Sequence, residues 1–161
     1  MKNLRKLLTT PLQLQQIPKW VPVVILAIAL IGFADATYLT IEHYQNEIPP
    51  CTIGGCESVL TSQYAQVAGI PVSLLGALNY LIIVTLLFLY LDTKKEIFLR
   101  VPVLLSVFGA VASIGFMYIM IFVIKAFCPY CVVSAATSFS IFAVSLWLVL
   151  KSRNLSQQVQ G

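Results

Sequence analysis

Charged residues are almost absent from four long stretches of this chain. The stretches are Val21–Ile41, Ile70–Leu91, Val101–Ile124 and Phe127–Leu150, and within them only Asp35 carries a formal charge. Each stretch reaches the length of about 20 apolar residues that a helix needs to cross the hydrocarbon of a bilayer. None shows the alternation of a barrel strand, and backbone groups in lipid must be hydrogen-bonded within the segment. The pattern therefore predicts an all-α membrane protein, a bundle of four transmembrane helices.

The overall composition supports a membrane environment. Of the 161 residues, 59% are hydrophobic and 10% are charged, whereas soluble domains carry about 25% charged residues. A water-soluble core of this size cannot hide that many apolar side chains. The net charge of +4 does not indicate a nucleic-acid partner, because the basic residues flank the predicted membrane helices.

The positions of the basic residues predict how the chain crosses the membrane. Nine of the ten Lys and Arg residues lie before the first stretch, between the second and third, or after the fourth. Since basic flanks stay on the cytoplasmic side, we expect both termini to be cytoplasmic and the other two connections to face outward. Lys125 alone falls on the outer side; the other nine are Lys2, Arg5, Lys6, Lys19, Lys94, Lys95, Arg100, Lys151 and Arg153.

This topology predicts three parts of the chain. They are a basic cytoplasmic lead-in (1–19), a four-helix membrane domain (20–150) and a polar cytoplasmic tail (151–161). The outer loop at 42–69 is the one substantial extramembrane segment, and its first half contains the prolines and glycines typical of a loop. From about Glu57 we expect a short amphipathic helix on the membrane surface, with an apolar face made of Val59, Leu60, Tyr64 and Val67.

The first apolar stretch also has to be distinguished from a signal peptide. The sequence Ala34-Asp35-Ala36 within it is similar to a signal-peptide cleavage site. However, the segment before the stretch is long and contains Pro11 and Pro18, and the apolar residues continue past Asp35. We therefore expect the first helix to be retained in the mature protein.

Four cysteines carry the candidate chemistry. Cys51 and Cys56 lie in the outer loop, and Cys128 and Cys131 form a Cys-x-x-Cys pair where the fourth stretch begins. Pro129 suits the first turn of a helix, which puts Cys128 near the N-cap, where the helix dipole favours a thiolate. Cys131 then lies one turn deeper, at the bilayer edge. This arrangement suits electron transfer from thiols in water to a lipophilic acceptor.

Two other interpretations of the cysteines remain open. Four cysteines are enough to ligate zinc, but the first pair is spaced Cys-x4-Cys, and the single histidine, His43, is more typical of an interfacial loop residue than of a ligand. The second alternative is a non-catalytic membrane protein with two structural disulfides, acting in assembly or interaction. A Cys-x-x-Cys disulfide closes a very short loop, however, and so adds little stability. The residues favour redox catalysis without a metal.

Several longer motifs resemble a known family. The segments "DATYLTIEHY", "CTIGGCESVLTSQYA" and "GIPVSLLGALNYL", followed by "FCPYC", are similar to bacterial members of the vitamin K epoxide reductase family that lack a fused thioredoxin-like domain. The resemblance covers about residues 20 to 150, and the order of the cysteine pairs is its most specific feature. It implies a membrane thiol-disulfide:quinone oxidoreductase that supports disulfide bond formation.

The resemblance also implies a role for each cysteine. A thiolate of a separate thioredoxin-fold, DsbA-like partner would attack Cys56, after which Cys51 would exchange with Cys128. Cys131 would then react with a membrane quinone, and none of these steps needs a metal. The resemblance further implies a bacterial inner membrane, with the cysteines on the periplasmic face.

The choice of quinone follows from two departures from the animal members of the family. Val72 and Ala135 stand where animal members have an asparagine and a tyrosine linked to vitamin K binding. Ubiquinone or menaquinone is therefore the expected acceptor, rather than vitamin K epoxide. Ser73 matches the helix-two serine of the family, which implies a place in the quinone pocket.

Two charged residues near the outer face carry a less specific signal. Asp35 is the only acid in a membrane stretch, which suggests either proton handling or polar support for the loop. Lys125 precedes Cys128 by three residues. It is placed to stabilise a thiolate or a reduced quinone, or simply to reach the lipid headgroups.

Overall fold

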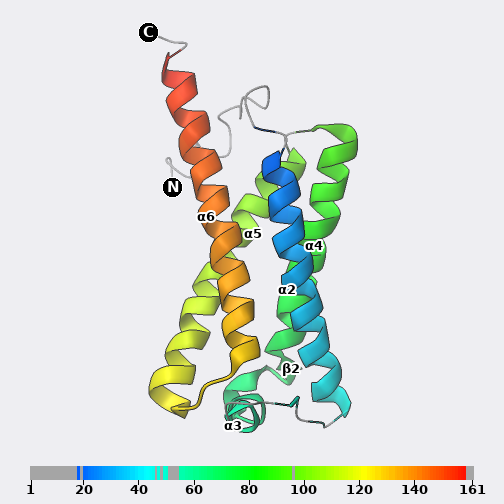
Figure 1. The fold of residues 1–161 in the computed structure, drawn as a ribbon, viewed down its shortest axis with the longest axis vertical. Coiled ribbons are helices and arrows are strands. Elements are labelled where there is room, and N and C mark those ends of the chain that lie inside the picture. Colours follow the sequence, from blue (N-terminus) through cyan, green and yellow to red (C-terminus); the bar gives the residue numbers. More distant parts are fainter. Residues whose placement is uncertain are drawn as a thin grey trace.

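Four long helices make up most of the fold (Figure 1). They are α2 (Trp20–Gln45), α4 (Val72–Thr93), α5 (Ile97–Tyr118) and α6 (Pro129–Gln158), and α5 continues as a π-helical segment, η3 (Ile119–Ile124). Each is long and apolar enough to span a bilayer, so the predicted four-helix membrane fold is confirmed. The computed structural model describes residues 18, 20–45, 47, 49–50, 55–95 and 97–158.

The helices form a closed bundle in which each packs against two neighbours. The order around the bundle is α2, α4, α5, α6 and back to α2. In Figure 1 the bundle stands upright, and the short helix α3 (Cys56–Leu60), the strand β2 (Ile70–Pro71) and the connection from η3 to α6 all lie at its lower end. The segments that carry the described cysteines therefore meet at one end of the molecule.

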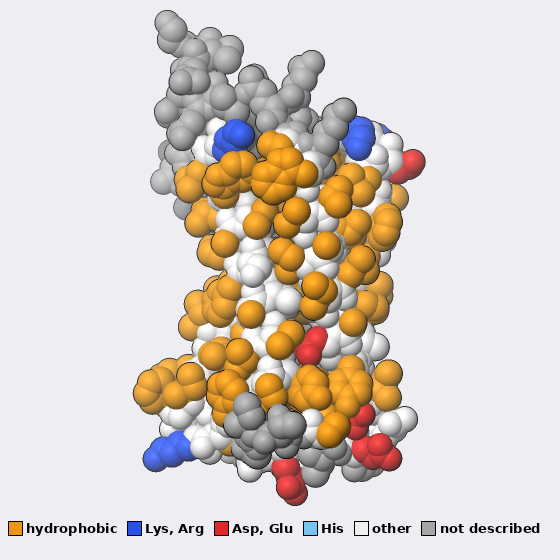
Figure 2. All heavy atoms as spheres, viewed as in Figure 1, with side chains coloured by type: hydrophobic (Ala, Val, Ile, Leu, Met, Phe, Trp, Pro, Cys, Tyr) orange, Lys and Arg blue, Asp and Glu red, His pale blue; other side chains and the backbone are white. Residues whose placement is uncertain are grey.

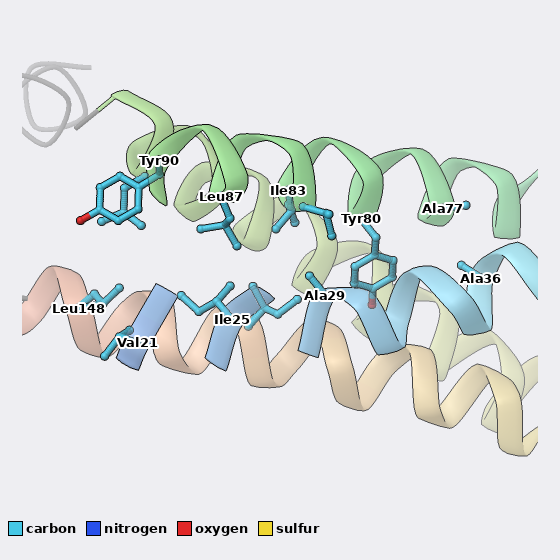
Figure 3. Close-up of a cluster of buried hydrophobic side chains, with 13 residues drawn as sticks. Val21, Ile25, Ala29, Ala36, Ala77, Tyr80, Ile83, Leu87, Tyr90 and Leu148 are labelled. Carbon is cyan, nitrogen blue, oxygen red and sulfur yellow. The ribbon is translucent and has the colours of Figure 1, made fainter. Parts of the chain in front are cut away.

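The core of the bundle lies between α2, α4 and α6. Side chains of α2 and α4 interleave along most of their length, and Leu148 of α6 closes the far end of this cluster (Figure 3). Gly32 leaves room for the Tyr80 ring, because a Cβ atom on Gly32 would lie 2.5 Å from Cζ of Tyr80. The Tyr80 ring therefore passes close to α2 and its hydroxyl reaches α6. That hydroxyl donates to the Ser134 carbonyl at 3.0 Å and lies 2.8 Å from Thr137 Oγ1.

The outside of the bundle is apolar over most of its height. Figure 2 shows hydrophobic side chains covering the middle of the molecule, with acidic and basic side chains gathered mainly at the two ends. Large side chains such as Phe108 and Phe122 are 70% and 63% exposed. An apolar surface of this extent is unfavourable in water, and lipid is the solvent that suits it.

The outer segment between α2 and α4 differs from the sequence-based expectation. The expected amphipathic helix is present as α3, but it ends at Leu60, and Tyr64 and Val67 belong to later elements. The predicted continuous helical face is therefore wrong. The Thr61 hydroxyl donates to the Glu57 carbonyl at 2.6 Å and the Ser62 hydroxyl to the Val59 carbonyl at 2.8 Å. Such side-chain bonds to the backbone compete with helix continuation.

A small hairpin then leads into α4. A 3-10 turn (η2, Gln63–Ala65) precedes β1 (Gln66–Val67), which pairs antiparallel with β2 in the register Val67↔Ile70. Ala68 and Gly69 form the two-residue loop with φ values of 53° and 80°, as a primed hairpin turn requires. Gly69 and Pro71 both belong to this hairpin.

Candidate redox site

Cys128 caps the N-terminus of α6, as the sequence predicts. Pro129 is the first residue of the helix, and the Val132 N–H donates to the Cys128 carbonyl at 3.1 Å. The Cys131 N–H donates to Cys128 Sγ at 3.4 Å. A sulfur that accepts the N–H of the third helical residue occupies the place of an oxygen in an ordinary N-cap. The position favours negative charge on that sulfur.

Cys128 and Cys131 are free thiols with different surroundings. The side chain of Cys131 donates a hydrogen bond to Cys128, and this bond is the main cause that lowers the pKa of Cys128 to about 7. Burial opposes the shift, and backbone N–H groups of Cys131 and Tyr130 assist it. Cys128 is therefore the thiol of the pair that ionises near neutral pH, although its residue surface is 0% exposed.

Cys56 belongs to the same buried cluster as Cys128. It is the first residue of α3, is 0% exposed and takes part in a disulfide. Cys56, Cys128, Val59 and Met120 form one buried cluster, separate from the core of the bundle. The outer-loop cysteine and the helix-six cysteine thus share one packed environment. Cys51, the remaining cysteine of the sequence, lies outside the described residues.

Gly55 makes the close approach of these two segments possible. Its φ of 142° is unfavourable for other residues, and a Cβ atom on it would lie 2.9 Å from both N and O of Phe127. The residue before Cys56 thus touches the backbone of the residue before Cys128. Sequence reasoning treated Gly55 only as a loop residue, and the glycine next to a cysteine in "GGC" was the available signal.

The π-helical end of α5 supplies another wall of the site. Met120 in η3 is 1% exposed and packs with the buried cysteines. The Ala126 N–H donates to the Met120 carbonyl at 3.3 Å, and Lys125 ends the helix with a φ of 54°. Wide helical turns of this kind often occur at functional sites. The Lys125 side chain is exposed.

Tyr130, between the two cysteines of α6, is a second residue that sequence reasoning missed. Its ring centroid lies 5.6 Å from that of Tyr38 in α2, and its hydroxyl is 3.4 Å from the carbonyl oxygen of Pro50. It therefore joins α6 to both α2 and the outer loop. A tyrosine inside Cys-x-x-Cys carries no local signal for such contacts.

Asp35 lies in the C-terminal half of α2 and is partly buried. One carboxylate oxygen, Oδ2, is shielded from solvent and has no hydrogen-bond partner among the described residues. Its negative charge acts on Cys128 and opposes the thiolate, as one of the weaker influences on that sulfur. The structure thus places Asp35 within electrostatic reach of the cysteine pair.

Ser73 and Lys125 are the two remaining residues of the predicted site. Ser73 is partly buried in the first turn of α4. Among the described residues, no hydrogen bond joins Ser73 or Lys125 to Cys56, Cys128 or Cys131. Their suggested roles therefore stay predictions.

Metal ligation finds no support in the part of the chain that the structure describes. No group of three or more His, Cys, Asp or Glu side chains there is arranged to hold an ion. His43 lies in the last turn of α2, where its Nε2 is 3.2 Å from Nε2 of Gln66. Because Cys51 falls outside the described residues, the expectation of a metal-free site stays a prediction.

Comparison with models of protein families identifies the family of this chain. Residues 23–146 match the model of the vitamin K epoxide reductase family. The matched segment includes the greater part of all four long helices and every cysteine of the chain. No individual curated protein gives a significant match.

Proposed function

The chain belongs to the vitamin K epoxide reductase family, and from that premise we propose that this integral membrane oxidoreductase transfers electrons from a thioredoxin-fold partner to a quinone. One observation carries the proposal. Cys56 of the outer loop is disulfide-bonded and shares a buried cluster with Cys128, whose neighbour Cys131 is a second free thiol. An oxidised cysteine and a reduced pair in contact form the minimum apparatus for a thiol–disulfide relay.

The first steps of the relay are two exchanges. A thiolate of the reduced partner attacks Cys56 in a Cys51–Cys56 disulfide, and the second partner thiol then closes the partner's own disulfide. Cys51 and Cys56 are left reduced by two electrons. The Cys51 thiolate then attacks Cys128 in a Cys128–Cys131 disulfide, and Cys56 releases the resulting mixed disulfide. The two electrons now reside on Cys128 and Cys131, which is the reduced state seen in the structure.

The last step returns the α6 pair to the disulfide. The quinone, as substrate, accepts two electrons and two protons. Cys131 is partly buried and packs, as Met117 and Ile124 do, against the apolar cluster that contains Cys128. This environment suits contact with a lipophilic acceptor. Cys128, with its pKa lowered to about 7 by the hydrogen bond from Cys131, supplies the thiolate that forms the disulfide bond to Cys131. The protons come from the Cys131 thiol and from water at the outer face.

The proposal includes a location and an orientation. The cysteine end is assigned to the outer face of a bacterial inner membrane and both chain ends to the cytoplasm. Lys94, Lys95 and Lys151 support this orientation. They lie at the helix ends remote from α3, since α4 ends at Thr93, α5 begins at Ile97 and the predicted fourth span ends at Lys151. Basic residues favour the cytoplasmic side.

The alternative of two structural disulfides is less well supported. Cys128 and Cys131 are both reduced and hydrogen-bonded to one another, whereas two cysteines with a structural role would form a disulfide.

Ubiquinone or menaquinone is the proposed acceptor, because Val72 and Ala135 replace the polar residues linked to vitamin K binding in animal members.

The test is quinone reduction by the purified protein in detergent. A reduced thioredoxin-fold protein supplies electrons, and the absorbance of the quinone reports turnover. We expect Cys131→Ala to abolish turnover, because the pair can no longer close a disulfide. Ser140→Ala is the matched control on the same helix, since the Ser140 hydroxyl bonds only its own helix at Ala136.

A second variant tests the order of the relay. Cys56→Ala should block electrons from the protein partner but spare those from dithiothreitol, a small thiol that can reduce the α6 pair directly. Normal turnover in Cys131→Ala would refute the proposed function. Equal loss with both donors in Cys56→Ala would refute the assignment of Cys56 as the entry point.

A further inference from the structure

The outer loop is attached at two points to the chain around the start of α6, at Phe127 and at Tyr130. At one point Gly55 packs on the backbone of Phe127. At the other, the Tyr130 hydroxyl donates to the Pro50 carbonyl at 3.4 Å. Pro50 immediately precedes Cys51, and Gly55 immediately precedes Cys56. Each contact therefore fixes the backbone next to one cysteine of the outer loop.

The two attachments differ in kind. Gly55 meets backbone atoms of Phe127, so this contact yields only if the main chain moves. The Tyr130 contact is a single, solvent-exposed hydrogen bond from a side chain, which can open without disturbing either backbone. The ring that carries the hydroxyl is held in turn by Tyr38 of α2, at a centroid distance of 5.6 Å. Gly55 is thus held by a contact between main chains, and Pro50 is held by an adjustable side-chain contact.

A disulfide imposes a narrow distance requirement on the Cys51 end. The Cα atoms of a disulfide lie about 4.4–6.8 Å apart, and adjacent Cα atoms in a chain are about 3.8 Å apart. Tyr130 lies two residues after Cys128, and its hydrogen bond to Pro50 restricts the region from which Cys51 can approach Cys128. Loss of that hydrogen bond would enlarge the region and make the productive approach less frequent.

We propose that Tyr130 is a positioning residue that holds the Cys51 end of the outer loop against α6 so that Cys51 and Cys128 can exchange. The proposal rests on the proposed function and deepens it, because it names the residue that connects the two cysteine pairs. Tyr130 transfers neither electrons nor protons. The exchange itself involves only sulfur atoms, with the Cys51 thiolate attacking Cys128 and Cys131 leaving as a thiolate.

The test follows the Cys51–Cys128 bond directly. In a Cys56→Ser, Cys131→Ser background only these two cysteines remain, and diamide, a thiol oxidant, removes two electrons and two protons to join them. Intact mass measures the rate of bond formation. Tyr130→Phe keeps the ring and the backbone but removes the hydroxyl. We expect it to slow bond formation about threefold to tenfold, the factor that one ordinary hydrogen bond represents.

Two further variants make the result specific. Tyr130→Leu removes the ring as well and should slow the reaction further, because the Tyr38 contact is also lost. Tyr118→Phe is the matched control, since Tyr118 is 60% exposed and contacts Phe122, away from the loop. It should react at the rate of the parent. Alkylation of Cys128 by iodoacetamide should be equal in all of these variants, because the backbone N–H groups next to its sulfur are kept.

The outcomes separate this proposal from the proposed function. A Tyr130→Phe rate equal to that of the parent would overturn the positioning role. Slower alkylation of Cys128 in Tyr130→Phe would also overturn it, because Tyr130 would then act on the thiol and not on the loop. Slower Cys51–Cys128 bond formation in a protein that reduces no quinone would leave the positioning role standing and refute the proposed function.

Discussion

At the scale of single residues, the two thiols of α6 are made unequal by one helix turn. Cys128 occupies the cap position, where it receives hydrogen bonds from the side chain and the backbone of Cys131. Cys131 donates its side-chain hydrogen bond to Cys128, and it packs against the buried cluster that contains Cys128. The same two residue types thus obtain different reactivity from their order in the helix, which is the general logic of Cys-x-x-Cys sites.

This inequality predicts the pH dependence of alkylation. In a Cys51→Ser, Cys56→Ser background, iodoacetamide should react with Cys128 along a curve that rises with pH and has its midpoint near the pKa of about 7. The rate rises because the thiolate is the nucleophile. Cys131→Ala removes the largest cause of the lowered pKa, so the midpoint should move to higher pH.

The matched control for this experiment is Cys131→Ser. Its hydroxyl can still donate to the Cys128 sulfur, so the midpoint should stay closer to that of the parent than in Cys131→Ala. Peptide mass spectrometry of the alkylated protein gives the rate at each pH. An unchanged midpoint in Cys131→Ala would show that the side-chain hydrogen bond does not set the reactivity of Cys128.

At the scale of elements, the site depends on how closely α3 approaches the connection between η3 and α6. This approach is possible because Gly55 has no side chain where Phe127 passes. Gly69, in the hairpin, also has a positive φ, of 80°, but a Cβ atom there would meet nothing within 4 Å. A comparison of the two glycines therefore distinguishes the free-energy cost of the backbone conformation from that of a steric clash with Phe127.

We expect Gly55→Ala to be considerably more destabilising than Gly69→Ala. The Gly69 substitution should lower the free energy of unfolding by about 1 kcal/mol, for conformational strain alone. Gly55→Ala should lower it by about 2–4 kcal/mol, because strain and overpacking combine. It should also slow electron transfer from the protein partner. Thermal unfolding in detergent gives the comparison, and equal losses of stability would mean that the Phe127 contact is unimportant.

At the scale of the whole molecule, most of the described basic residues lie at the end of the bundle opposite the cysteines. The described thiols, the disulfide-bonded Cys56 and Lys125 lie at the end that holds α3. Lys94 and Lys95 follow the opposite end of α4. This distribution supports the proposed orientation, because basic residues favour the cytoplasmic side.

This separation predicts which positions a reagent can reach from outside the cell. In a cysteine-free background, Lys125→Cys should react with a membrane-impermeant maleimide added to intact cells. Lys94→Cys should react only after the membrane is permeabilised. Both side chains are exposed, so a difference reports the side of the membrane and not burial. Labelling of Lys94→Cys alone in intact cells would reverse the proposed orientation.

The features that were predicted correctly from the residues are those that depend on local physics. The lengths of the apolar stretches predicted four membrane helices, because lipid leaves a spanning backbone no partner outside its own helix. Their bounds shifted modestly, as where α2 runs to Gln45 and not Ile41. Pro129 predicted the start of α6 and hence the capping position of Cys128, because proline lacks the N–H that the first turn does not use.

Contacts between residues far apart in the chain could not be predicted and emerge from the packing of the helices. Three contacts join residues far apart in the chain: Tyr80 with Gly32, Phe127 with Gly55, and Tyr130 with Pro50. No periodicity or spacing encodes such pairs, since each depends on how whole helices pack around one another. The early end of α3 at Leu60 has a local cause instead: hydrogen bonds from Thr61 and Ser62 to carbonyls three and four residues earlier outweigh a weak apolar pattern.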